Sequence, residues 1–175
     1  GLAFVALAAY LLFAPFGPST ETFVDIAPGT GTPAIALQMQ RAGIIRSRYI
    51  FFLLRKLTGG TLRAGEYRFD HPAPVTEVYA HLRHGDVYTV ALTIPEGYNI
   101  FDIAQAVETA GFGPRADFLA AERQHTELIT EWSPHATSLE GFLFPATYQF
   151  ARHAAPLQML TTMVRRFRQA SGQLG

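Results

Sequence analysis

The chain has 175 residues, of which 49% are hydrophobic and 16% are charged, and its 14 basic side chains balance its 14 acidic ones. This length and apolar content suit one sizeable domain or two small ones, and they exclude a disordered tail. A net charge of zero provides no basic face for nucleic acid, and the absence of cysteine excludes a disulfide framework, a thiolate nucleophile and a cysteine-based metal site.

The first sixteen residues, Gly1 to Phe16, contain no charged side chain. A helix needs about 20 apolar residues to span a bilayer. Because the sequence begins with Gly rather than Met, we interpret residues 1–20 as the end of a membrane anchor whose start is missing. A cleaved signal peptide and a buried core helix are the alternatives.

An internal repeat follows, in which Ile26 and Gly43 recur at one constant offset as Ile94 and Gly111. Each copy predicts a strand, a Pro/Gly turn and an amphipathic helix that a glycine ends. The predicted strands are residues 22–26 and 87–94, and the helices begin at Thr32 and Asn99 as N-caps. A second helix follows in each copy, at residues 47–57 and 115–123.

The first copy closes with a predicted strand at residues 62–69, and a helix at residues 74–83 that Gly85 ends. The order strand–helix–helix–strand resembles the LysM module, a small fold that binds chains containing N-acetylglucosamine. A generic α+β repeat without a ligand is the alternative. We therefore expect an α+β fold, with a LysM-like subdomain at residues 21–85 and a second LysM-like unit within residues 86–175.

Among the 14 carboxylates, Glu140 has the sequence setting that best suits chemistry. It lies in SLEGFLFPATYQF, where aromatic and apolar residues follow it. Such a setting disfavours the ionised form of a carboxyl group, so that a glutamate there can act as a general acid. The alternative is a strand from which Glu140 points to solvent, opposite a buried aromatic face.

Four further residues of this segment are candidates for substrate binding. Thr147 and Tyr148 are candidates for orienting the carboxyl group or a sugar hydroxyl. Phe142 and Phe144 are candidates for lining a sugar subsite, with core packing as the competing role because residues two apart share a strand face. The pair His81 and His84 lacks a nearby third ligand, so we predict no metal site.

Three strings, LRAGEYRF, LTIPEGYNIFDIA and LEGFLFPATY, together resemble the YceG-like family of endolytic murein transglycosylases. The resemblance covers nearly the whole chain. It implies a single-pass protein of the bacterial cytoplasmic membrane, with a LysM-like region and a catalytic domain (residues 86–175) on the periplasmic side. It also implies that Glu140, as the single acid–base, cleaves the bond between N-acetylmuramic acid and N-acetylglucosamine in nascent peptidoglycan and leaves a 1,6-anhydro end. No cofactor is implied; the implied partners are glycan strands, the membrane and peptidoglycan synthases, but not nucleic acid.

The chain departs from the family pattern in two places. Ala146 stands where the family usually has aspartate, and family chains continue past residue 175. We therefore expect the last helix, residues 155–170, to present an apolar face that missing residues would cover. That predicted face consists of Leu157, Leu160, Val164 and Phe167. Two other functions stay open: a non-catalytic glycan-binding module, in which Glu140 is structural, and an assembly factor that positions cell-wall synthases.

Overall fold

The computed structural model describes residues 1–172 and has an α+β architecture, as the sequence predicts. The chain divides into two compact units, Gly1–Tyr88 and Thr89–Gly175. Each unit contains a two-stranded antiparallel sheet with helices packed on it. The roles assigned to residues 1–20, 21–85 and 86–175 stay predictions.

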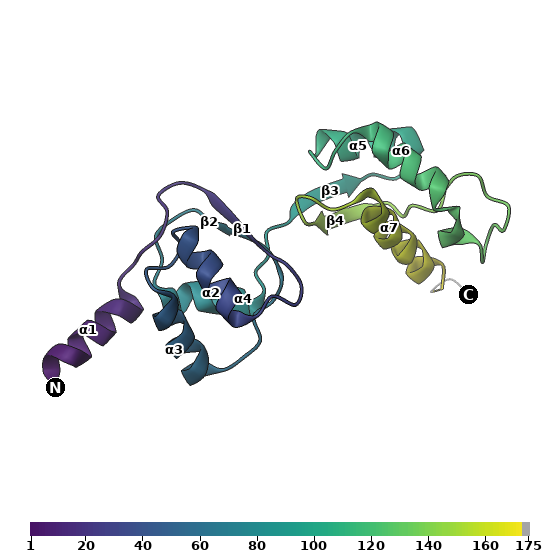
Figure 1. The fold of residues 1–175 in the computed structure, drawn as a ribbon. Coiled ribbons are helices and arrows are strands. Elements are labelled where there is room, and N and C mark those ends of the chain that lie inside the picture. The colour runs from purple at the N-terminus through teal and green to yellow at the C-terminus, as the bar shows by residue number, and fades with distance from the viewer. Residues whose placement is uncertain (173–175) are drawn as a thin grey trace. The chain divides into compact units, whose positions relative to one another are not determined.

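The first unit begins with a helix and continues with a strand–helix–helix–strand run and a closing helix (Figure 1). Its elements are α1 (Leu2–Phe13), β1 (Thr22–Ile26), α2 (Thr32–Arg41), α3 (Arg48–Thr58), β2 (Gly65–Phe69) and α4 (Val75–His84). Strand β1 pairs with β2, from Thr22 opposite Phe69 to Ile26 opposite Gly65. Within residues 1–172, no helix combines the length and the apolar character that a membrane crossing requires.

The second unit repeats the strand–helix–helix–strand run, with an added 3-10 helix before the second strand, and ends on a longer helix (Figure 1). Its elements are β3 (Val90–Ile94), α5 (Ile100–Thr109), α6 (Arg115–Gln124), the 3-10 helix η1 (Thr126–Ile129), β4 (Ala146–Phe150) and α7 (Pro156–Ser171). Strand β3 pairs with β4, so that Leu92 lies opposite Tyr148 and Thr93 opposite Thr147. One face of this sheet is buried against the helices, and the other is exposed.

The predicted repeat is confirmed up to the end of its first helix. The bounds of β3 and α5 follow those of β1 and α2 by the same constant offset that relates Ile26 to Ile94. The two copies then diverge, because the step from the start of β2 at Gly65 to the start of β4 at Ala146 is longer than this offset. The second copy is therefore the longer one, and its extra length lies between α6 and β4. Glu140 lies in this longer connection.

Two details of the prediction are wrong. Thr32 is not the N-cap of α2, because the helix begins at Thr32 itself, after Gly31, with no side-chain cap. The predicted apolar face of the last helix is also misplaced, since Leu157 is 40% exposed whereas Leu160 and Val164 are buried. The buried face of α7 is completed by Met159 and Met163, which lie on the same side as Leu160 and Val164. This face packs in the core of the second unit, so Leu160 and Val164 are covered without further residues.

Candidate active site

The N-terminus of α5 is the structural base of the candidate site. Asn99 Oδ1 accepts hydrogen bonds from the N–H groups of Phe101 (2.9 Å) and Asp102 (3.0 Å). Asp102 Oδ2 accepts in return from the N–H of Asn99, at 3.1 Å, which completes a capping box. The cap predicted at Asn99 is confirmed. The box leaves the N–H of Ile100, the first residue of the helix, for another acceptor.

Glu140 supplies that acceptor. Its Oε2 accepts a hydrogen bond from the N–H of Ile100 at 2.6 Å, across 40 residues of sequence. The side chain is otherwise exposed, and within residues 1–172 its second oxygen, Oε1, accepts no hydrogen bond. A helix N-terminus attracts a carboxylate because its N–H groups are unpaired and the helix dipole is positive there. Glu140 is therefore fixed at one oxygen and accessible at the other.

A tight turn presents Glu140 to solvent. The N–H of Phe142 donates to the carbonyl of Leu139 at 3.0 Å, and Gly141 has a φ of 82°, which favours glycine. Leu139 is fully buried and anchors the turn in the core. The apolar setting predicted for Glu140 is wrong, because the residue lies in an exposed turn before the strand and not among buried aromatic side chains.

Phe142 belongs to an aromatic cluster. Its ring stacks on Trp132 with centroids 6.1 Å apart and meets the edge of Phe167 at 5.3 Å. Trp132 and Phe167 also contact each other, at 5.4 Å. These contacts join the turn to the connection after η1 and to α7. They give Phe142 a packing role, and its place in a sugar subsite stays a prediction.

Thr147 and Tyr148 point to opposite faces of the β3–β4 sheet. Thr147 is exposed, and its Oγ1 lies 3.0 Å from that of Thr93 on the neighbouring strand. Tyr148 is buried, and its hydroxyl donates to the carbonyl of Phe144 at 2.5 Å. Burial raises the pKa of Tyr148 to about 12, against the opposing effect of the positive charge on Arg166. Neither side chain hydrogen-bonds to Glu140 in the described part of the chain.

The half-buried ring of Phe144 lies beside α7. The guanidinium carbon of Arg166 is 5.9 Å from the centre of this ring. Phe144 thus combines a backbone carbonyl bound by Tyr148 with a ring in contact with a cation. Its place in a sugar subsite, like that of Phe142, stays a prediction.

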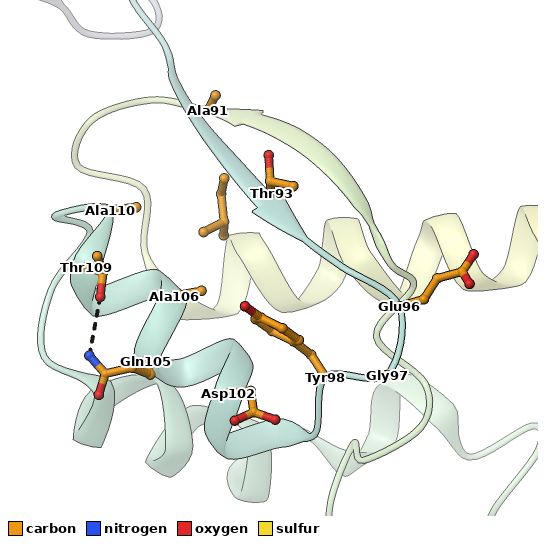
Figure 2. Close-up of a pocket in the computed structure, with 11 residues that line it drawn as sticks. Ala91, Thr93, Glu96, Gly97, Tyr98, Asp102, Gln105, Ala106, Thr109 and Ala110 are labelled. Carbon is orange, nitrogen blue, oxygen red and sulfur yellow. Dashed lines mark hydrogen bonds between the residues drawn. The ribbon is translucent and has the colours of Figure 1, made fainter.

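A shallow groove of about 730 Å³ runs between β3 and α5 (Figure 2). Tyr98, 43% exposed, extends over it, and Asp102, Gln105 and Thr109 supply polar groups along α5. Tyr98 and Asp102 of this groove each lie two residues along the chain from Ile100, which binds Glu140. Glu96, in the turn before Tyr98, also lines the groove (Figure 2).

Tyr98 and Phe101 are not among the predicted site residues, although the side chain of Phe101 is 60% exposed. The internal repeat could have indicated these two residues, because the first copy has Thr30 at the position of Tyr98 and Pro33 at the position of Phe101. Aromatic residues that one copy alone has, at the start of a helix, indicate a binding surface more than a core. Within residues 1–172, no three His, Asp or Glu side chains are grouped so as to hold a metal ion.

Comparisons with known proteins agree with the resemblance seen in the sequence. Two proteins of Streptococcus pneumoniae, from strains D39 and R6, are each named endolytic murein transglycosylase and are 27% identical to this chain over 151 residues. The alignment covers 71% of this chain and 27% of each relative, so the chain spans about a quarter of their length. A crystal structure of a YceG-like protein from Listeria monocytogenes has 22% identity and a TM-score of 0.43, and the match covers 90% of this chain and 57% of that one. A model of the YceG-like family matches residues 24–174, and the chain therefore belongs to the YceG-like family.

Proposed function

We propose that this chain carries the acid–base residue of an endolytic murein transglycosylase, which cuts within nascent peptidoglycan strands. Membership of the YceG-like family and the names of the pneumococcal relatives support this activity. The observation that carries the proposal is the placement of Glu140. Its carboxylate is exposed and is held at one oxygen by the N-terminus of α5, the helix that also lines a groove with an exposed aromatic ring.

In the proposed reaction, Glu140 acts twice. As an acid it protonates the oxygen that joins N-acetylmuramic acid to N-acetylglucosamine, and the bond from C1 to that oxygen breaks. As a base it then removes the proton of the muramoyl 6-hydroxyl, whose oxygen bonds to C1 and closes a 1,6-anhydro ring. No water is consumed, so one carboxyl group is sufficient, whereas glycoside hydrolases use two.

The exposure of Glu140 sets a condition on this mechanism. A general acid transfers its proton best where water is excluded, whereas the carboxyl group of Glu140 is exposed to solvent in the free chain. We propose that the bound glycan covers Glu140 and excludes water from its carboxyl group. Oε1, which has no hydrogen bond among the described residues, is the oxygen that would face the glycosidic bond.

We assign glycan binding to the groove between β3 and α5. Sugar rings present apolar faces that stack on aromatic rings and hydroxyl groups that pair with polar side chains. Tyr98 offers an aromatic ring for stacking, and Asp102, Gln105 and Thr109 offer polar groups for hydrogen bonds to sugar hydroxyls. Phe142, Phe144 and Thr147 remain subsite candidates, while Tyr148 would act indirectly, by holding the carbonyl of Phe144.

The remaining expectations concern the first unit. We propose that its strand–helix–helix–strand run binds glycan as LysM modules do. We also propose that α1 attaches the protein to a membrane on the extracytoplasmic side, where it meets peptidoglycan synthases. The exposed apolar side chains of α1, which include Val5, Leu7 and Phe13, support attachment. Release of the protein from a membrane fraction on deletion of residues 1–16 tests this part.

One observation favours a second candidate, a glycan-binding module without catalysis. The bond from Ile100 to Glu140 satisfies a helix N–H, so Glu140 has a structural role that needs no chemistry. Products of a peptidoglycan digest separate the two. Internal cuts with 1,6-anhydro ends support the transglycosylase, whereas products with reducing ends indicate hydrolysis by a second carboxylate. Glycan binding without any cleavage supports the non-catalytic binding module.

A further inference from the structure

Glu122 is a buried carboxylate that the proposed chemistry does not use. It lies on α6 and is 1% exposed. Its Oε2 accepts two hydrogen bonds, from the hydroxyl of Ser138 at 3.0 Å and from the N–H of Leu139 at 2.9 Å. Its Oε1 lies 3.5 Å from Nε of Arg123, which is exposed. Burying a charge is unfavourable unless it is paired and hydrogen-bonded, so these contacts explain why Glu122 is tolerated there.

The hydrogen bonds continue from Glu122 to Glu140. Ser138 Oγ, which donates to Glu122, accepts a bond from the N–H of Glu140 at 3.1 Å. The carboxylate fixes the direction of the hydroxyl proton, so that a lone pair of Oγ faces the backbone of Glu140. At its other end, the side chain of Glu140 is held by Ile100. Residue 140 is therefore held by α6 through its backbone and by α5 through its carboxylate.

From this geometry we propose that Glu122 is a positioning residue, which sets the location of the Glu140 carboxyl group through Ser138 and the backbone of Leu139. The inference rests on the proposed function of Glu140. Reactions of this kind depend on placement, and an error of about 1 Å at the reacting group can lower the rate by about a hundredfold. Both bonds at Glu122 go to one oxygen, Oε2, so a neutral amide oxygen in the same place would preserve them.

The experiment compares Glu122→Ala and Glu122→Gln in the full-length protein, with cleavage of purified peptidoglycan strands as the assay. We expect Glu122→Ala to lower kcat about tenfold to a hundredfold with KM nearly unchanged, because substrate contacts are kept and the acid–base is displaced. We expect Glu122→Gln to stay within about threefold of wild type, since it retains an acceptor. The control is Phe118→Leu, which loosens the same buried face of α6 without touching a hydrogen bond of Glu122.

A second pair of variants keeps the test decisive if Glu122→Ala does not fold. Ser138→Ala removes the hydroxyl between Glu122 and Glu140, whereas Ser138→Thr retains a hydroxyl. We expect the alanine variant to lose kcat and the threonine variant to recover most of it. The proposal is overturned if neither alanine variant lowers kcat more than Phe118→Leu does, or if the losses appear in KM instead.

Amide hydrogen exchange separates this proposal from the proposed function. In wild type the N–H groups of Leu139 and Glu140 are both hydrogen-bonded. We expect Glu122→Ala to accelerate their exchange at least tenfold, beyond any change at the N–H groups of α7. If wild type cuts no glycan but the exchange result holds, the enzymatic function fails and the positioning network stands. If exchange at these two amides is unchanged, the network is refuted whatever the activity.

Discussion

Removing the Asn99 side chain tests the arrangement at the start of α5 on which the candidate site depends. In Asn99→Ala, the N–H groups of Phe101 and Asp102 lose their acceptor, while the N–H of Ile100 keeps Glu140. Replacing an asparagine N-cap by alanine costs about 1 kcal/mol, within a range of roughly 0.5 to 2. For a unit the size of Thr89–Gly175, that corresponds to a fall in Tm of about 4–8 °C.

The chain offers a direct assay, because Trp132 is its only tryptophan and lies in the second unit. Its ring contacts Phe142 and Phe167, so unfolding of this unit should change its fluorescence. We would follow urea unfolding of wild type, Asn99→Ala and Asn99→Asp, the last of which retains an acceptor oxygen. We expect a lower midpoint with an unchanged slope for alanine and a near-normal midpoint for aspartate. Equal midpoints for wild type and Asn99→Ala would refute the assignment of the cap.

Two further predictions use the same fluorescence signal. The pKa of Tyr148 is raised to about 12 in the folded protein, from an ordinary value of 10. The neutral hydroxyl therefore contributes stability that is fully present below pH 10 and is lost as the pH rises toward 12. Tyr148→Phe should therefore remove much of the alkaline loss of stability over this window; an identical decline in both proteins would contradict the shift. Gly141→Ala should destabilise the second unit by about 1–2 kcal/mol, because residue 141 has a φ of 82°, which an alanine rarely adopts. A new Cβ would meet no atom within 4 Å, so backbone strain and not a steric clash is the expected cause. A midpoint equal to wild type would show that the turn before Phe142 adjusts freely.

Local rules account for what the sequence predicted well. The repeat was visible because its copies share strand, turn and helix residues at a constant offset, and α2 and α5 keep that offset in the structure. The cap at Asn99 follows from residue type and position alone. The second strand of the first unit was predicted in the right region with a less accurate start, since β2 starts at Gly65 and not at residue 62.

Long-range contacts account for what the sequence could not predict. The setting of Glu140 depends on Ile100, 40 residues away, and composition around residue 140 suggested burial where the structure has an exposed turn. Glu122 is charged and is followed by polar residues in the sequence, yet it is buried, because the connection after η1 folds back and places Ser138 and Leu139 on its carboxylate. Neither contact leaves a periodic signal.

Substitutions of Glu140 test whether this residue is an acid–base or only a cap on α5. Glu140→Gln keeps an oxygen that can accept the bond from Ile100, whereas Glu140→Ala does not. We would digest peptidoglycan with wild type and both variants, count 1,6-anhydromuramoyl ends by mass spectrometry, and measure stability by Trp132 fluorescence. We predict that both variants form these ends about 10²–10⁴ times more slowly, although only Glu140→Ala is clearly destabilised. If Glu140→Gln produces anhydro ends at the wild-type rate, the carboxyl group transfers no proton, and the proposed mechanism is wrong.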